Sequence, residues 1–189
     1  MTRRTPRFVR ERTGNVAVEF AFLLPIMVTL IFGVVEVTQA VLAYMKLVDA
    51  TQTVADLVTQ QQSVSSGDFP NFYTAGQLVM TPFPAAALGL AITSVTFDSS
   101  GTASVAWHEE CGGINPIQNA ASLAAGTGSN PAKPYGGANE SVVIVQGNYA
   151  YKGWLQYVLP KALNITQLAF SRPRLVGSIP YQGTQTACS

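Results

Sequence analysis

The feature that most constrains this chain is an apolar run near its start, from Val16 to Val35, in which only Glu19 and Thr29 are polar. A helix needs about 20 predominantly apolar residues to cross the hydrocarbon core of a bilayer. The run has that length. The sequence therefore predicts a single membrane-spanning helix over residues 16–35.

The residues before this run are strongly basic. Residues 1–14 contain Glu11 as their one acid and five arginines, which are Arg3, Arg4, Arg7, Arg10 and Arg12. Basic residues beside a membrane span stay on the cytoplasmic side. We therefore expect residues 1–14 to be a cytoplasmic leader, the helix to anchor the chain in a bacterial inner membrane, and residues 63–189 to be periplasmic.

Glu19 is unusual because it lies inside the expected span, five residues after Gly14. A charged side chain at the centre of a span costs roughly 2.5–3.5 kcal/mol on insertion scales, so such a residue is functional by default. Pro25 has a structural interpretation, because membrane helices tolerate proline and bend at it. Glu19 and Gly14 are therefore the residues that an ordinary anchor does not explain.

A basic leader, a glycine, and a span with glutamate at the fifth position after that glycine resemble the processing site of type IV prepilins. The wider stretch resembles the amino terminus of TadE-like minor pilins of the tight-adherence (Tad, or Flp) pilus system. The residues that carry this resemblance are Gly14, Ala17, Val18, Glu19, Phe20, Ala21, Leu24, Pro25, Phe32, Gly33 and Glu36.

The resemblance implies cleavage by a prepilin peptidase between Gly14 and Asn15, whereas major pilins usually carry a large apolar residue where Asn15 stands. Glu19, followed by the aromatic Phe20, would then be the fifth mature residue and would pair with the amino terminus of a neighbouring subunit. The implied partners are other Tad pilus subunits and inner-membrane platform proteins. The implied role is assembly of a pilus for surface adherence and biofilm formation.

A secretory signal peptide is the first alternative for residues 1–40. Its apolar region normally has about 7–15 residues and is followed by an A-x-A-like cleavage site. Here the apolar run is longer, and Thr38-Gln39-Ala40 matches such a site poorly. The sequence favours a retained anchor or a pilin-like leader.

The helix is expected to continue beyond the membrane, because residues 37–62 contain neither glycine nor proline. A helix over residues 15–62 would be about 70 Å long at 1.5 Å per residue. Residues spaced three and four apart form one helical face. We expect that face to pack on the exported domain; its members are Val37, Val41, Tyr44, Val48, Thr51, Ala55 and Val58.

The exported residues 63–189 are enough for one modest globular domain. The chain is 48% hydrophobic and only 11% charged, and basic and acidic residues nearly balance beyond Glu36. A domain with this charge balance has no cluster of basic residues of the kind that binds nucleic acid.

Two alternating segments, Leu90–Asp98 and Thr102–Glu109, predict a β-hairpin. Residues 141–152 are the strongest predicted strand. The fold class predicted is therefore α+β and pilin-like, with a long N-terminal helix and a small antiparallel sheet. The remaining predictions are a packed connector over 69–87, a loop over 112–139 with a helical turn near 118–125, a short helix over 153–163, and a last strand within 165–181.

The sequence contains no constellation typical of catalysis. His108 is the only histidine, so the zinc-binding motif H-E-x-x-H cannot be completed. The better interpretation of His108-Glu109-Glu110 is the solvated end of a strand. Asp98 opens a D-S-S-G-T stretch similar to the metal motif of von Willebrand A domains, but its flanking strands favour a turn. We expect no enzymatic activity, metal, cofactor or small-molecule substrate.

Cys111 and Cys188 are the only cysteines. Two cysteines in an oxidising compartment suggest one disulfide. Two free thiols or an intermolecular bridge are the alternatives that sequence leaves open.

Two functional hypotheses follow. The first is a minor pilin or pseudopilin that primes, joins or caps a Tad pilus. The second is a membrane-anchored periplasmic binding or scaffold module that never enters a filament. Cleavage after Gly14 discriminates between them, because an uncleaved leader would keep its arginines at the membrane and block extraction.

Overall fold

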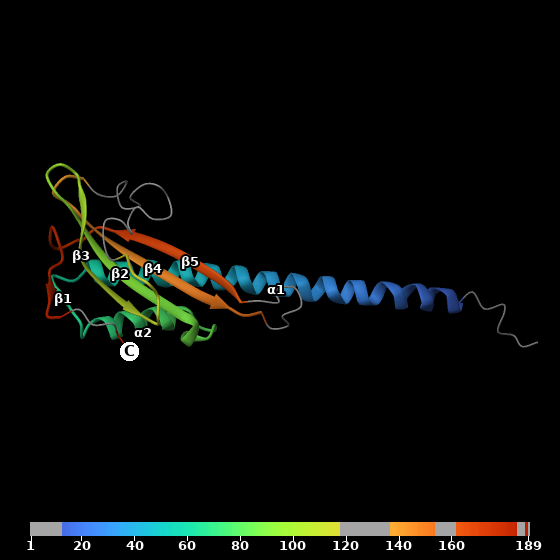
Figure 1. Ribbon diagram of the computed structural model, residues 1–189. Coiled ribbons are helices and arrows are strands. Elements are labelled where there is room, and N and C mark those ends of the chain that lie inside the picture. Colours follow the sequence, from blue (N-terminus) through green and yellow to red (C-terminus); the bar gives the residue numbers. More distant parts are fainter. Residues whose placement is uncertain (1–12, 118–136, 154–161, 185–187, 189) are drawn as a thin grey trace, which may run out of the picture.

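The computed structural model describes residues 13–117, 137–153, 162–184 and 188. A long helix packs its C-terminal half against an antiparallel sheet, and its N-terminal half projects beyond the sheet (Figure 1). The α+β, pilin-like fold class predicted from the sequence is confirmed. The elements are α1 (Thr13–Thr59), β1 (Val64–Ser65), α2 (Phe69–Val79), η2 (Ala85–Ala87), β2 (Leu88–Phe97), β3 (Ala103–Cys111), β4 (Ser141–Tyr151), β5 (Leu163–Ser171) and β6 (Tyr181–Gln182).

The four-stranded sheet has the order β3-β2-β4-β5, and every neighbouring pair is antiparallel. The predicted hairpin is β2–β3, and the predicted strong strand is β4. β5 ends at Ser171, before Pro173, because proline cannot donate to a strand ladder. A separate parallel pair joins β1 to β6, with Val64 opposite Tyr181.

A β-bulge in β3 changes which face of the sheet the side chains after it point to. Ser94 pairs with Trp107 and Val95 pairs with Val105, so Ala106 is the extra residue. Trp107 is thereby buried in the cluster beneath the helices, whereas Val105 packs with the cluster on the opposite face. The indole Nε1 of Trp107 donates to the carbonyl oxygen of Ile179 at 2.8 Å.

The main core lies between α1 and the sheet, but the packed face of α1 is not the predicted one. Val37, Val41 and Tyr44 are 50%, 51% and 45% exposed. The prediction of this face was therefore wrong for the first half of the segment, although Thr51, Ala55 and Val58 are buried as expected. The residues that face the sheet there are Glu36, Ala40, Ala43 and Leu47.

Small residues decide this choice of face because they let the helix approach the sheet closely. A Cβ placed on Gly147 of β4 would lie 2.5 Å from Thr51 Cγ2 and 2.9 Å from Leu47 Cδ1. Ala43 and Ala50 of α1 are both fully buried. Apolar spacing alone could not separate this face from the adjacent one, since both carry apolar residues.

Residues 69–79, predicted as part of a connector, form α2. Pro70 lies in the first turn, where its missing N–H is not needed and its fixed φ suits a helix. Phe69, Phe72 and Gly76 are buried against the core. Asp68 and Pro70, followed by this three-and-four spacing, were the sequence pattern that could have indicated the helix.

The opposite face of the sheet has its own cluster of Val95, Phe97, Val142 and Ile144, and Ile117 covers it. The Ile117 N–H donates to Gln146 Oε1 at 3.0 Å. The beginning of the predicted 112–139 loop therefore packs on this face. The predicted helical turn near 118–125 and most of the predicted helix 153–163 lie outside the described residues.

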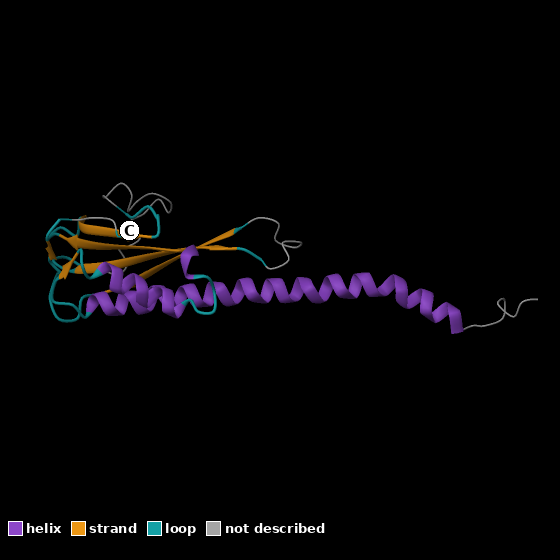
Figure 2. Ribbon diagram, turned by 90° about the horizontal axis from the view of Figure 1, so that it is seen from below, coloured by secondary structure: helices purple, strands orange, loops and turns teal. Residues whose placement is uncertain are grey.

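The N-terminal part of α1 bends away from the straight line of the rest of the helix (Figure 2). Pro25 lies inside α1, and proline interrupts the helical hydrogen-bond ladder. The Thr29 hydroxyl donates to the Pro25 carbonyl oxygen at 2.8 Å. We therefore attribute the bend to Pro25.

Candidate functional site: the projecting helix and its junction with the sheet

The resemblance places the predicted processing site at the start of α1. The helix begins at Thr13, so the peptide bond between Gly14 and Asn15 belongs to its first turn. The described side chains begin at Val16. Glu19 and Phe20 follow within the next turns, and both are exposed, Phe20 to 58%.

The projecting part of α1 exposes almost every large apolar side chain that it carries. From Val16 to Val35 only Gly33 is partly covered. An exposed apolar surface of this size marks a membrane or protein interface. This is one long apolar N-terminal helix, and its length and composition are consistent with a single membrane span.

Glu36 marks the point where α1 leaves the exposed region and meets the globular domain. Its side chain is only 3% exposed. A Cβ placed on Gly153, just after β4, would overlap Glu36 Oε1. The carboxylate therefore occupies the space that a side chain at position 153 would need.

Tyr151, two residues before Gly153, shares the environment of Glu36. Burial raises the pKa of the Tyr151 phenol, and the negative charge of Glu36 raises it further. Tyr149 and Tyr151 both make edge contacts with Phe83, with ring centroids 6.3 Å apart in each pair. Sequence reasoning named Glu36 only as part of the family pattern and did not anticipate its burial.

Cys188, near the C-terminus, is held against the last residues of β3. Cys111 and Cys188 form a disulfide with Cα atoms 5.0 Å apart. The Cys188 N–H also donates to the Glu110 carbonyl oxygen at 3.0 Å. This part of β3 therefore has its outer edge occupied.

Tyr181 adds a partly buried polar contact to β3. Its hydroxyl donates to Glu109 Oε1. Burial, and then this hydrogen bond and the charge of Glu109, raise the pKa of Tyr181 to about 12. The ring also packs with Phe69 and Trp107, so the contact ties β6 to β3 and α2.

Asp98 forms a turn. Its Oδ1 accepts hydrogen bonds from the Ser100 N–H, the Ser100 hydroxyl and the Thr102 N–H at 2.6–2.8 Å. The bond from the Ser100 hydroxyl, followed by the Thr102 N–H, lowers the pKa of Asp98. Within the described residues, no group of three histidine, cysteine, aspartate or glutamate side chains is placed to hold a metal ion.

This geometry defines a pilin-like protein: one projecting apolar helix, buried at its C-terminal half by a small antiparallel sheet. Comparison with known families agrees, since residues 14–56 carry a TadE-like domain. That domain begins at the glycine of the predicted processing site and ends within α1, and it implies a Tad pilus-associated protein. No curated protein and no solved structure matches the chain.

Proposed function

We propose that this protein is a minor pilin or pseudopilin that takes part in the assembly of a Tad pilus used in surface adherence and biofilm formation. The single observation that carries the proposal is the position of the TadE-like domain at residues 14–56. It covers the exposed apolar part of α1, the surface available for a membrane or for neighbouring subunits.

In this proposal α1 anchors the chain in the inner membrane through residues 16–35, with leader residues 1–14 in the cytoplasm. The arginines of the leader support that orientation. The domain from residue 63 onward then lies in the periplasm, where a Cys111–Cys188 disulfide is chemically stable.

Processing by a prepilin peptidase would remove the basic leader and leave an amine at Asn15. Glu19 lies four residues further along the same helix. A buried carboxylate is tolerable when a cation neutralises it, so the amine of an incoming subunit is the proposed partner of Glu19. Such a pair would set the axial register between subunits.

N-terminal sequencing of the protein purified from membranes tests this proposal most directly. We expect the sequence to start at Asn15, and we expect the same processed form in pili sheared from cells. A start at residue 1 or 2 would contradict processing. It would favour the alternative, a membrane-anchored periplasmic binding or scaffold module outside the filament.

A further inference from the structure

The two outer strands of the sheet differ sharply in how they are protected. An edge strand presents unpaired backbone groups, and proteins normally blunt it with charges, bulges or covering segments. β3 has all three: the bulge at Ala106, the acids Glu109 and Glu110, and Cys188 paired to its end. β5 has none of these protections in the part of the chain that the structure describes.

β5 is also well shaped for pairing. It extends over nine residues, Leu163–Ser171, and pairs with β4 in an uninterrupted register from Leu163 to Ser171. Its sequence, LNITQLAFS, contains no charged residue and no proline. In an antiparallel ladder, alternate residues point their N–H and C=O groups away from the paired strand, so the outer side of β5 is a template for another strand.

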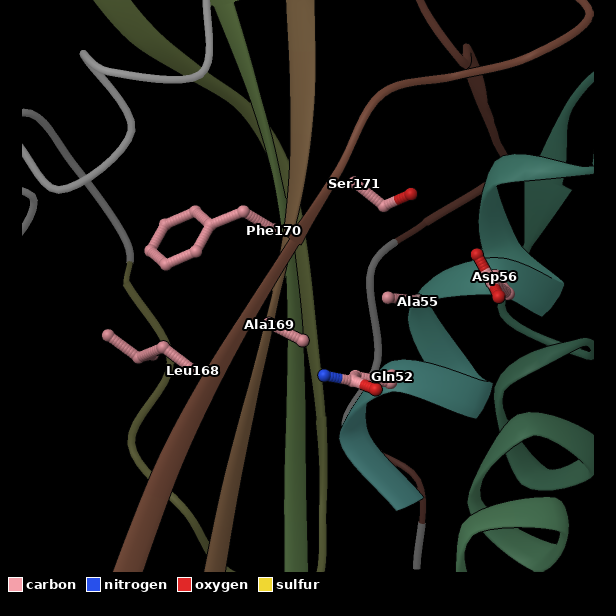
Figure 3. A pocket seen from close by; sticks show the side chains of 7 residues that line it. All are labelled: Gln52, Ala55, Asp56, Leu168, Ala169, Phe170 and Ser171. Carbon is pink, nitrogen blue, oxygen red and sulfur yellow. The ribbon is translucent and has the colours of Figure 1, made fainter. Parts of the chain in front are cut away.

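A groove runs beside the C-terminal half of this edge. It has a volume of about 390 Å³ and is lined by Gln52, Ala55 and Asp56 of α1 and by residues 168–171 of β5. Figure 3 shows Ala169 and Ser171 on the side of α1, and Leu168 and Phe170 on the opposite side of the strand. An added strand would therefore meet a narrow polar wall on one face and apolar side chains on the other.

The charges around the groove are already balanced. Arg174 forms an ion pair with Asp56 at 2.7 Å, and Arg172 forms one with Glu140 at 3.1 Å. A charged segment would have to compete with these pairs, whereas an uncharged one would not. Leu168, which is 38% exposed, favours apolar residues on the far face of the incoming strand.

A second copy of this chain does not fit the edge as an antiparallel strand. β5 runs in the same general direction as α1, away from the helix N-terminus (Figure 1). Antiparallel pairing of β5 with β5 would point the two α1 helices in opposite directions, which one membrane cannot accommodate. For antiparallel pairing, a copy with a parallel α1 would have to offer β3, whose outer edge is bulged, acidic and occupied by Cys188.

We propose that β5 is a docking edge for an extended, uncharged segment of a different protein, which adds as an antiparallel fifth strand. Backbone hydrogen bonds supply the affinity in this mode, and alternate side chains supply specificity. Small residues of the segment face the groove beside Gln52, and apolar residues pack beside Leu168. The inference rests on the membrane anchoring in the proposed function, but not on cleavage after Gly14.

The test begins in cells with the full-length protein, carrying a photoreactive residue at Thr166 of β5 or, as a matched control, at Ser104 of β3. Both positions are exposed on edge strands. We expect position 166 to cross-link strongly to one uncharged segment of another protein, and position 104 to do so weakly. Cross-links to another copy of this chain, to lipid only, or to nothing would overturn the proposal.

A synthetic peptide of the mapped segment is then added to the detergent-purified full-length protein. We expect slower amide hydrogen exchange in β5 but not in β3. Thr166→Lys should weaken binding by roughly tenfold or more, because position 166 shares a strand face with Leu168, where apolar side chains of the segment would partly desolvate the charge, and Ser104→Lys should not. Peptide binding that leaves β5 exchange unchanged would overturn the proposal.

The cross-link at position 166 is read in a protein that carries only the photoreactive residue there, so it remains decisive if Thr166→Lys fails to fold. N-terminal sequencing of the same sample reports cleavage separately. An uncleaved protein that cross-links at β5 would refute processing and keep the docking edge. A processed protein that gives no cross-link at β5 would support cleavage and refute the docking edge.

Discussion

The carboxylate of Glu36 lies directly against Gly153, so closely that a Cβ on residue 153 would overlap Glu36 Oε1. This contact joins the outer end of the exposed helical segment to the end of β4. It lies at the point where the projecting helix enters the domain.

We therefore expect Gly153→Ala to lower the free energy of unfolding by about 1–3 kcal/mol, the usual range for overpacking. The same change in a Glu36→Ala background should have a much smaller effect, because the obstructing carboxylate is gone. Chemical denaturation of the full chain in detergent, followed by tryptophan fluorescence, measures the coupling as a double-mutant cycle.

Gly177→Ala is the matched control, since a Cβ at that position meets no atom within 4 Å. It should leave stability nearly unchanged. Equal effects of Gly153→Ala in both backgrounds would show that the two residues are not coupled.

The disulfide gives a second prediction. Cys111 and Cys188 are 77 residues apart in sequence, and cross-links that close long loops restrict the unfolded chain most, with typical stabilisation of about 2–4 kcal/mol. The double variant Cys111→Ser, Cys188→Ser should lose stability in that range and release the C-terminus to proteolysis. Mass mapping without reductant should find the linked peptides in periplasmic material; two free thiols there would refute the bond.

The sheet could be predicted from sequence, whereas the packed face of α1 could not. β2, β3 and β4 are rich in β-branched and aromatic residues and are bounded by turn residues, which is the pattern that indicates strands. Helical spacing identifies a face only when the competing faces are polar. Here Val37 and Ala40 lie on adjacent faces, and the closer approach possible at Ala43 and Gly147 decided which one is buried.

The candidate site, too, could be predicted from the sequence only in part. A glutamate inside an apolar run identifies Glu19 directly, because its chemistry conflicts with its neighbours. Glu36 lies beyond the predicted span, where a glutamate is unremarkable, and its role depends on Gly153, more than a hundred positions later in the chain. Contacts of such sequence separation leave no local pattern, so only the fold reveals them.

The raised pKa of Tyr181 predicts that the stability of the fold decreases at alkaline pH. Its pKa is about 12 in the folded protein against an ordinary value of 10.0. Below pH 10 the phenol is protonated in both states. As pH rises from 10 towards 12, the unfolded chain loses this proton before the folded protein does, so the free energy of unfolding falls.

Tyr181→Phe should therefore lower stability at neutral pH, through loss of the bond to Glu109, and flatten the decline above pH 10. Melting temperatures in detergent between about pH 8 and pH 12 measure this slope. Burial also raises the pKa of Tyr149 and Tyr151, so part of the decline should remain. Tyr44→Phe, an exposed position on α1, is the control, and an identical slope in both variants would contradict the role of Tyr181.

The last prediction concerns Glu19, which the proposed mechanism needs after processing and not for recognition by the peptidase. The mature amine and the carboxylate would meet in a layer of low dielectric, where opposite charges attract strongly and an unpaired charge is unfavourable. Glu19→Gln keeps the size and hydrogen bonding of the side chain but removes its charge. It should also make membrane insertion easier.

We expect the Glu19→Gln protein to reach the membrane and to be cleaved normally, but pilus assembly and adhesion should fall by at least about tenfold, because breaking a buried ion pair costs about 3–5 kcal/mol. Immunoblots of membranes and sheared pili measure level, processing and piliation in the same cells. Glu36→Gln does not serve as a control, since Glu36 is buried against Gly153. Asp49→Asn does, because Asp49 is an exposed acid on the same helix. Full piliation with processed Glu19→Gln protein would remove charge pairing from the mechanism and leave Glu19 as a polar residue that the membrane merely tolerates.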